Sequence, residues 1–225
     1  MLKRIASIIL FLLVVSLVHS QENGNNRQQL QEKYEIKNLK INNHYSNFGT
    51  TFYGENKVVY ASPREGFQII RNVWKGNNQP FLDLFIGEIA EDGELINVKN
   101  FSENINKRYH EADVAFTKDG KTVYFSRNNY LNGVLTRDTT GTGLIQLYRA
   151  RVDAKGEWVD IEPMPFNNDN YQTGHPALSR DERTLFFISD MPGGYGITDV
   201  YKASIGPNGE IGLPVNMGPK INTAG

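Results

Sequence analysis

Three histidines lie beyond residue 40, and an imidazole can act as a metal ligand or as a general acid or base near neutral pH. They are His44, His110 and His175. Relative to the repeats of the chain they stand at different positions, so they do not predict a ring of metal ligands. The segment His110–Asp113 brings one imidazole and two carboxylates together. Such a cluster could hold a metal ion, but we prefer the interpretation that these are solvated turn residues.

Nucleophilic catalysis is a second possibility to weigh, because Ser179 and Asp181 closely follow His175. A serine, a histidine and an aspartate can form a catalytic triad, yet a triad is defined by geometry rather than by closeness in sequence. The Gly-x-Ser-x-Gly elbow of many hydrolases does not occur in this chain. We therefore expect no catalytic residues and no enzymatic activity. His175 is expected to be a hydrogen-bonded, partly buried imidazole at the start of a strand.

A glycine-rich loop near the C-terminus carries Asp190, Gly193, Gly194, Gly196 and Asp199. Carboxylates in such a loop can bind Ca²⁺. The loop lacks the alternating Asp or Asn ligands and the terminal Glu of a dedicated calcium loop. We expect the glycines to supply unusual backbone angles and the aspartates to cap turns. No metal and no cofactor are expected, although calcium binding by a loop stays an open alternative.

The composition of the 225-residue chain excludes several classes of function. It has 24 Lys and Arg residues against 25 Asp and Glu residues, so it lacks a basic footprint and we expect no nucleic-acid partner. The absence of cysteine excludes a disulfide framework, a thiolate zinc site and a cysteine nucleophile. The 21 glycines, 12 phenylalanines and 11 tyrosines favour many short strands joined by tight turns.

The N-terminus has the pattern of a secretory signal peptide. A positive start at Lys3 and Arg4 precedes an almost wholly apolar run, and cleavage is predicted between Ser20 and Gln21. A retained membrane anchor is the alternative, but the apolar run is shorter than the roughly 20 residues needed to span a bilayer. We therefore expect an exported protein.

From residue 41 onward the sequence repeats itself, and two segments recur in a fixed order. The first reads KVVYAS from Lys57, KTVYFS from Lys121 and RTLFF from Arg183, at intervals of 64 and 62 residues. The second reads LDLF from Leu82, IQLY from Ile145 and TDVY from Thr198. Two such anchors in three copies indicate a repeat architecture.

Each copy is expected to form four short antiparallel strands. Asp119 and Gly120 predict a tight hairpin turn in the second copy, because Asp-Gly readily adopts the positive φ angles of such turns. Asp181 marks the same turn in the third copy. Tyr124 and Phe186 lie in the returning strands and are expected to be buried. A four-stranded antiparallel unit that repeats about every 40–60 residues is typical of a propeller blade.

The predicted fold class is therefore all-β: a partial β-propeller of about three four-stranded antiparallel blades, preceded by a signal peptide. A β-sandwich would also have short strands, but it would not repeat this register. The expected parts are a signal peptide at 1–20, a polar linker at 21–40, blades at 41–104, 105–166 and 167–220, and the start of a fourth blade at 221–225.

The third copy resembles a known repeat. The residues Ser179–Phe187, followed by Ser189–Gly196 and Asp199–Tyr201, are similar to the WD-like β-propeller repeat of bacterial envelope proteins, the type found in TolB. The resemblance is greatest to the N-terminal propeller region of OmpA-family proteins of the Bacteroidetes kind, and it covers residues 41–225. The first copy departs from the pattern, because Gly54–Asn56 replaces the Asp-Gly turn.

This resemblance implies an assembly role. The expected protein is a non-enzymatic scaffold for protein–protein interaction, located in the periplasm or at the periplasmic face of the outer membrane. The implied partners are envelope proteins, and peptidoglycan-associated assemblies reached through a C-terminal wall-binding domain that these 225 residues lack. The alternative is the propeller portion of a secreted peptidase or glycoside hydrolase whose catalytic residues lie elsewhere.

The last residues of the sequence bear on the number of propeller blades. Ile221 and Asn222 repeat the Ile-Asn pair that begins at Ile41 and at Ile105. Closed propellers use about four to eight blades. We therefore expect the chain to be the N-terminal part of a longer protein, with closure of the ring by several chains as the alternative.

Overall fold

The computed structural model describes residues 36–63, 73–74, 79–102, 105–106 and 109–224. The chain divides into two compact units, Met1–Leu39 and Lys40–Gly225, and the described strands all belong to the second. The predicted signal peptide, its cleavage site at Ser20 and Gln21, and the linker up to residue 35 lie outside the described residues. In the described part of the chain, no helix has the length and apolar character needed to cross a bilayer.

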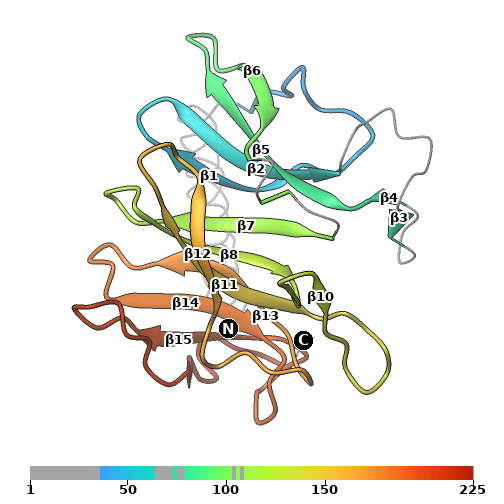
Figure 1. Ribbon diagram of the computed structural model, residues 1–225, viewed down its shortest axis with the longest axis vertical. Helices are drawn as coiled ribbons and strands as arrows, with labels where there is room; N and C mark the ends of the chain where they lie inside the picture. Colours follow the sequence, from blue (N-terminus) through green and yellow to red (C-terminus); the bar gives the residue numbers. More distant parts are fainter. Residues whose placement is uncertain (1–35, 64–72, 75–78, 103–104, 107–108, 225) are drawn as a thin grey trace, which may run out of the picture. The chain divides into compact units, whose positions relative to one another are not determined.

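Most described strands of the second unit form four-stranded antiparallel sheets, each of which runs through its strands in sequence order (Figure 1). The first sheet contains β1 (Phe48–Tyr53), β2 (Lys57–Pro63), β5 (Leu82–Ile89) and β6 (Leu95–Asn100). The second contains β7 (Glu111–Phe116), β8 (Thr122–Asn128), β11 (Ile145–Val152) and β12 (Trp158–Pro163). The third contains β13 (Thr173–Leu178), β14 (Thr184–Ser189), β15 (Asp199–Ser204) and β16 (Val215–Asn216). Two short ribbons pair β3 (Val73–Trp74) with β4 (Gln79–Pro80) and β9 (Tyr130–Leu131) with β10 (Val134–Leu135).

The predicted fold class is confirmed: the described domain is all-β, with three four-stranded antiparallel sheets arranged as successive propeller blades. The first strands of the sheets are neighbours, because β7 contacts β1 on one side and β13 on the other. Figure 1 shows the same order, with the colours of the three sheets following the sequence.

The hairpins between first and second strands are closed by hydroxyl and carboxylate side chains. In the second sheet, Oδ1 of Asp119 accepts hydrogen bonds from the Thr117 hydroxyl at 2.7 Å and from the Lys121 amide at 3.0 Å. In the third, Oδ1 of Asp181 accepts one from the Ser179 hydroxyl at 2.6 Å. Both aspartates therefore stabilise their hairpins through hydrogen bonds within the turn, as in Asx and ST turns.

The hairpin of the first sheet is one residue shorter than that of the second. Tyr53 pairs directly with Lys57. In the second sheet, the Thr117 amide donates a hydrogen bond to the carbonyl oxygen of Thr122. Thr117 and Thr122 are one position further apart in the sequence than Tyr53 and Lys57 are. β2 is therefore displaced by one residue relative to the alignment of the KVVYAS and KTVYFS segments.

Stacked aromatic pairs between the second and third strands show the correct register. The pairs are Tyr60 with Phe85, Phe125 with Tyr148 and Phe187 with Tyr201, with ring centroids 5.8, 5.8 and 5.9 Å apart. Tyr60 thus corresponds to Phe125, and its sequence alignment with Tyr124 is wrong by one position. A slip of one residue matters because it moves every side chain of a strand to the other face.

Two apolar clusters join the sheets. The cluster of the first and second sheets consists of Val59, Ala61, Leu84, Ile105, Ala112, Val114, Val123, Phe125, Tyr148, Ala150 and Trp158. The cluster of the second and third sheets consists of Tyr124, Leu147, Met164, Phe166, Leu185, Phe187, Tyr201 and Ala203.

The burial predicted for the returning strands is right for one residue and wrong for the other. Tyr124 is buried in the second cluster, as expected. Phe186 occupies the equivalent position of the third sheet but is only half-buried, and its neighbour Phe187 is buried instead. Since side chains alternate along a strand, Phe187 faces the second sheet and Phe186 faces away from it.

The Ile-Asn pairs close one blade rather than open the next. The side chain of Asn106 accepts a hydrogen bond from the Leu84 amide at 2.8 Å and donates one to the Leu84 carbonyl at 2.9 Å. Asn222 makes the same two bonds with Val200, at 2.8 and 3.0 Å. The expectation that Ile221 and Asn222 begin a fourth blade is therefore corrected, because Asn222 is bound to the third strand of the third sheet.

Candidate binding site at the first strands

The first strands of the three sheets border one open pocket of about 420 Å³, which we call the first-strand pocket. Its lining comprises residues 49–51 of β1, 113–116 of β7 and 175–178 of β13. Each of these strands lies at the edge of its sheet, so one edge of its backbone is free of strand partners. The pocket exists only when all three sheets are assembled.

Each first strand contains a β-bulge at the same position of the repeat. The pairing of β1, β7 and β13 with their neighbours shifts near Gly49, Asp113 and His175, respectively. These residues have φ angles of +64°, +43° and +53°. Positive φ is uncommon outside glycine, and Asp and His are among the residues that adopt it more readily. A bulge re-aims the side chain it carries, and here all three bulges lie in the pocket.

Asp113 and His175 form an ion pair across the boundary between the second and third sheets. Nδ1 of His175 lies 3.0 Å from Oδ2 of Asp113. The Asp113 side chain is 13% exposed and that of His175 is 58% exposed. The His175 amide also donates a hydrogen bond of 2.8 Å to Oγ of Ser126 in β8. The imidazole is therefore held at one nitrogen while much of the ring remains open to solvent.

Gly49 makes room for this pair. A Cβ atom at Gly49 would lie 2.6 Å from Oδ1 of Asp113, closer than such atoms can approach. The carboxylate of Asp113 thus fills space left by a missing side chain on the first sheet. The three bulge positions form one packed series, in which Asp113 reaches toward the first sheet and His175 toward the second.

The electrostatics of the pair favour a protonated imidazole. The hydrogen bond with the Asp113 carboxylate raises the pKa of His175, and burial opposes this rise. A carboxylate on Nδ1 fixes the orientation of the ring and leaves Nε2 as the outward nitrogen. Such a ring can donate a hydrogen bond to a carbonyl or carboxylate oxygen of a ligand, or it can exchange a proton with one.

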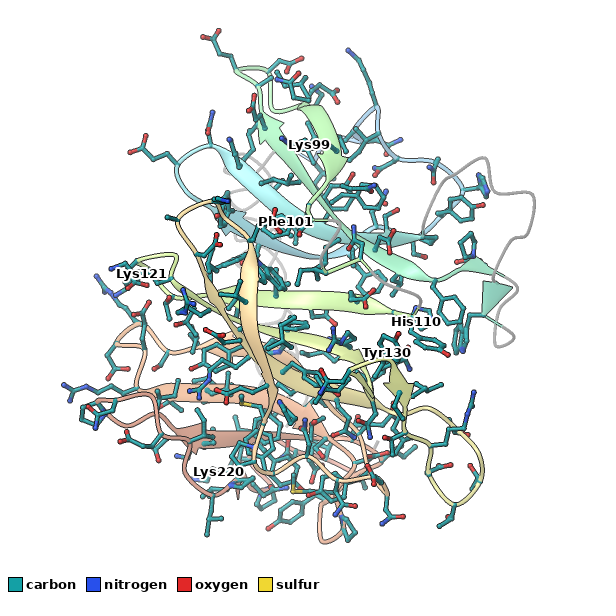
Figure 2. All side chains as sticks on the ribbon, viewed as in Figure 1. Lys99, Phe101, His110, Lys121, Tyr130 and Lys220 are labelled. Carbon is teal, nitrogen blue, oxygen red and sulfur yellow. The ribbon has the colours of Figure 1, made fainter. Side chains whose placement is uncertain are left out.

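His110 is not the solvated turn residue that the sequence suggested. Its ring packs edge-on against Phe81, at 4.7 Å between centroids, and against Trp74, at 5.2 Å. Its Nδ1 accepts a hydrogen bond from the Leu82 amide at 3.2 Å. Burial lowers the pKa of His110 to about 4, so the ring is neutral at physiological pH. Figure 2 places His110 and Tyr130 at the same end of the second sheet.

The rest of the His110–Asp113 segment is also structural or belongs to the pocket. Glu111 is fully buried in β7, and Asp113 binds His175. The solvated-turn interpretation of this segment is therefore wrong, because β7 lies between two other first strands. Across the described ranges, the structure contains no group of three or more acidic or histidine side chains arranged to hold a metal ion.

The structure does not assemble a triad from Ser179, His175 and Asp181. The Ser179 hydroxyl is bound to Asp181 and, as an acceptor, to the Thr184 amide at 3.0 Å. His175 is bound to Asp113 instead. The serine and the aspartate thus close the β13–β14 hairpin.

The glycine-rich loop is organised by its two aspartates. Asp199 accepts hydrogen bonds from the amides of Tyr195 and Gly196, at 2.6 and 3.0 Å, and from the Asn216 side chain at 2.8 Å. A Cβ atom at Gly194 would collide with Oδ2 of Asp199. Gly193 has a φ of +91°, whereas Asp190 accepts a bond of 2.6 Å from the Gln172 amide. These carboxylates are engaged with backbone and amide donors.

The sequence interpretation missed the pairing of Asp113 with His175, although the repeat contained the signal. The two residues are 62 residues apart, the same interval that separates the second and third copies. Because one of these positions holds an aspartate and the other a histidine, the residue types do not reveal the relation. Gly49 lies a further 64 residues upstream of Asp113 and completes the series.

No protein-family model and no curated protein matches the sequence. Among solved structures, a puromycin-hydrolyzing peptidase of Mycobacterium tuberculosis is similar over 80% of this chain and 24% of its own, with 16% identity and a TM-score of 0.43. A thermostable family-43 glycoside hydrolase is similar over 77% of this chain and 54% of its own, with 14% identity and a TM-score of 0.43. A puromycin hydrolase is similar over 79% of this chain and 33% of its own, with 14% identity and a TM-score of 0.40. The chain spans about a quarter to about a half of the length of these proteins.

Proposed function

We propose that the chain is the propeller scaffold of an exported, OmpA-family type envelope protein and that it binds a protein partner through the first-strand pocket. The supporting observation is the Asp113–His175 pair, held in an open pocket to which all three sheets contribute. A partner oxygen, from a backbone carbonyl or a carboxylate, is the group that the outward Nε2 of His175 would recognise. In this proposal the chain has no catalytic activity, and it acts in the periplasm.

The test is recovery of a partner from envelope extracts of the source cells, with the 225-residue chain as bait and mass spectrometry as the readout. His175→Ala removes the donor from the pocket. His44→Ala is the matched control, because His44 is an exposed histidine outside the pocket lining. We expect the same envelope protein with the wild type and with His44→Ala. His175→Ala should bind it about tenfold more weakly, as for loss of a central contact.

Equal recovery by all three proteins would contradict a role of the first-strand pocket in binding. Failure of the wild-type chain to recover any envelope protein or peptidoglycan fragment would contradict the scaffold role itself.

The second candidate is the propeller portion of a secreted peptidase or glycoside hydrolase. The observation that favours it is chemical: an imidazole oriented by a carboxylate, with a raised pKa, is suited to general acid or base catalysis. Under this candidate the main catalytic residues lie elsewhere, so a longer protein that includes them would turn over peptide or glycan substrates, and Asp113→Asn or His175→Ala would lower that turnover. Such turnover would replace the scaffold proposal.

A further inference from the structure

We infer that the free face of the third sheet docks a further four-stranded blade of the same kind. By the free face we mean the side of that sheet which points away from the second sheet, with Phe186, Val200, Met217 and Ile221. This inference concerns the completion of the fold, and it is independent of the partner proposed for the first-strand pocket.

The second sheet shows what this face is built to do. Its equivalent residues are Tyr124, Leu147, Met164 and Phe166, and all four belong to the cluster shared with the third sheet. The equivalence follows from the backbone: the Met164 amide bonds to the Leu147 carbonyl and the Met217 amide bonds to the Val200 carbonyl, both at 3.0 Å. Since these positions are buried against a neighbouring sheet in the second copy, we infer that the apolar residues at the same positions in the third copy also form an interface.

In the third sheet the same positions stay accessible. Phe186, Val200 and Met217 are only half-buried. Ile221 is 55% exposed, whereas its equivalents Ile105 and Phe166 are 0% and 8% exposed. Val215 in β16 is also exposed on this sheet. The four residues that define the free face have buried equivalents in the second sheet, and such a row of exposed apolar side chains is the kind of patch that marks an interaction surface.

Lys202, a polar residue of the free face, is also exposed where its equivalent in the second sheet contacts the next sheet. Arg149 of the second sheet donates a hydrogen bond to the carbonyl oxygen of Gly209, in a turn of the third sheet. Lys202 stands two residues after Val200, as Arg149 stands two residues after Leu147, and it is exposed. Lys202 therefore has the position from which a donor reaches the corresponding turn of the next blade.

The two existing interfaces define the occupant. The docking side of the second sheet carries Val123 and Phe125 on its second strand and Tyr148 and Ala150 on its third. The docking side of the third sheet carries Leu185 and Phe187, then Tyr201 and Ala203. The shared pattern is an aliphatic residue, one residue of any type and Phe on the second strand, with Tyr-x-Ala on the third. Phe187 stacks on Phe166 with centroids 4.5 Å apart, so the Phe of the docked blade would lie over Ile221.

A second copy of this chain fits the face less well through its first sheet. There Gly87 stands two residues after Phe85, in place of the alanine of the Tyr-x-Ala pattern. Tyr60, which takes the position of Phe125, is already buried, with only 6% of its surface exposed. The occupant that matches the pattern is thus a separate blade with the aliphatic-x-Phe and Tyr-x-Ala strands.

The experiment appends such a blade to the 225-residue chain. A second copy of residues 171–222 is joined directly after Gly225. Three residues then lie between Asn222 and the Tyr171 of the added copy, the same number that lies between Asn167 and Tyr171 in the chain itself. The chain has no cysteine, so Ile221→Cys provides a single thiol for a maleimide probe. We expect labelling at this thiol to be at least about tenfold slower in the extended chain, because it would react only after local opening. Val134→Cys, at a position 65% exposed in β10 of the short β9–β10 ribbon, is the control and should label at one rate in both chains.

Equal labelling of Ile221→Cys in the extended and unextended chains would overturn the inference. A second measurement uses the unextended chain alone. Val200→Glu should leave its thermal midpoint nearly unchanged, whereas Leu147→Glu, at the equivalent buried position, should prevent folding. If Val200→Glu were as harmful as Leu147→Glu, the face would already be covered and the inference would be wrong.

Discussion

Gly49, Asp113 and His175 occupy one repeated backbone position, and each contributes a different property. The bulge imposes a positive φ on all three. Glycine leaves space, aspartate fills that space with a carboxylate, and histidine adds a donor that the carboxylate holds. A repeat that supplies identical backbone positions can therefore build a mixed polar pair without any local sequence motif.

The first prediction concerns pH and the Asp113–His175 pair. The pKa of His175 is raised above its ordinary value of 6.5 in the folded chain. The folded state therefore holds this proton more tightly than the unfolded state does. The pair contributes fully below about pH 6.5, and its contribution is lost as the pH rises through the raised pKa. Urea unfolding between about pH 5.5 and 8.5 should show a free energy of unfolding that falls with pH over this window.

Asp113→Asn should remove this part of the pH dependence, because it removes the group that raises the pKa of His175. His44→Ala should leave the slope as it is in the wild type. An unchanged slope in Asp113→Asn would show that other groups cause it.

The second prediction concerns Gly49. Gly49→Ala should destabilise the chain by about 2–3 kcal/mol, since the new Cβ meets Asp113 and also adopts a strained positive φ. Gly54→Ala is the control, because Gly54 has a similar φ of +70° but open space around its Cβ position. Chemical denaturation should find Gly49→Ala clearly more harmful. Similar losses for the two variants would mean that φ strain alone decides.

At the scale of the elements, the blades are stabilised by side-chain hydrogen bonds to the backbone as well as by the packing of apolar strands. Each hairpin after a first strand in the second and third sheets is closed by an aspartate and a hydroxyl side chain. The asparagines after the fourth strands bind the backbone of the third strands. These side chains satisfy backbone groups that an edge or a turn would otherwise leave unpaired.

The third prediction tests the hydrogen bonds that Asn106 makes with the backbone of the third strand. Asn106→Ala should cost about 1–3 kcal/mol, because the Leu84 amide would lose its partner in a buried environment and the Leu84 carbonyl would keep only its bond from the Phe101 amide. Asn208→Ala removes an asparagine that bonds only to Glu210 in an exposed turn, and it should cost less than about 0.5 kcal/mol. Thermal melts compare the two variants. A loss for Asn208→Ala as large as that for Asn106→Ala would refute the special role of Asn106.

At the scale of the described domain, stability resides between the sheets. Each sheet contributes one face to an apolar cluster, and the second sheet contributes both of its faces. The position of a residue in the stack thus decides its burial as much as its type does. Tyr124 and Phe186 occupy equivalent strand positions, yet only Tyr124 has a sheet against it.

The fourth prediction follows from this asymmetry. Phe187→Ala and Tyr124→Ala should each destabilise the chain by about 3–5 kcal/mol, because both side chains are buried between sheets. Phe186→Ala should cost about 1–2 kcal/mol, since its ring is already half exposed. Guanidinium unfolding measures all three. Equal losses for Phe186→Ala and Phe187→Ala would contradict the assignment of the two faces.

The sequence by itself was sufficient for the fold class and for the turns of the repeat. Strand period, Asp-Gly and Ser-x-Asp turns and the two recurring segments act over a few residues, and such local preferences are legible without a structure. The sequence also carried the interval between Asp113 and His175, although only as a number.

The tertiary structure decided which faces are buried and which side chains meet. The one-residue shorter hairpin at Tyr53 reverses the faces of β2, and no propensity of its residues reveals that reversal. The burial of Phe187 rather than Phe186 depends on the sheet that packs beside them. The ion pair needs two bulges from different sheets to converge. The last two outcomes depend on contacts between residues far apart in the chain, whose energies local sequence does not encode.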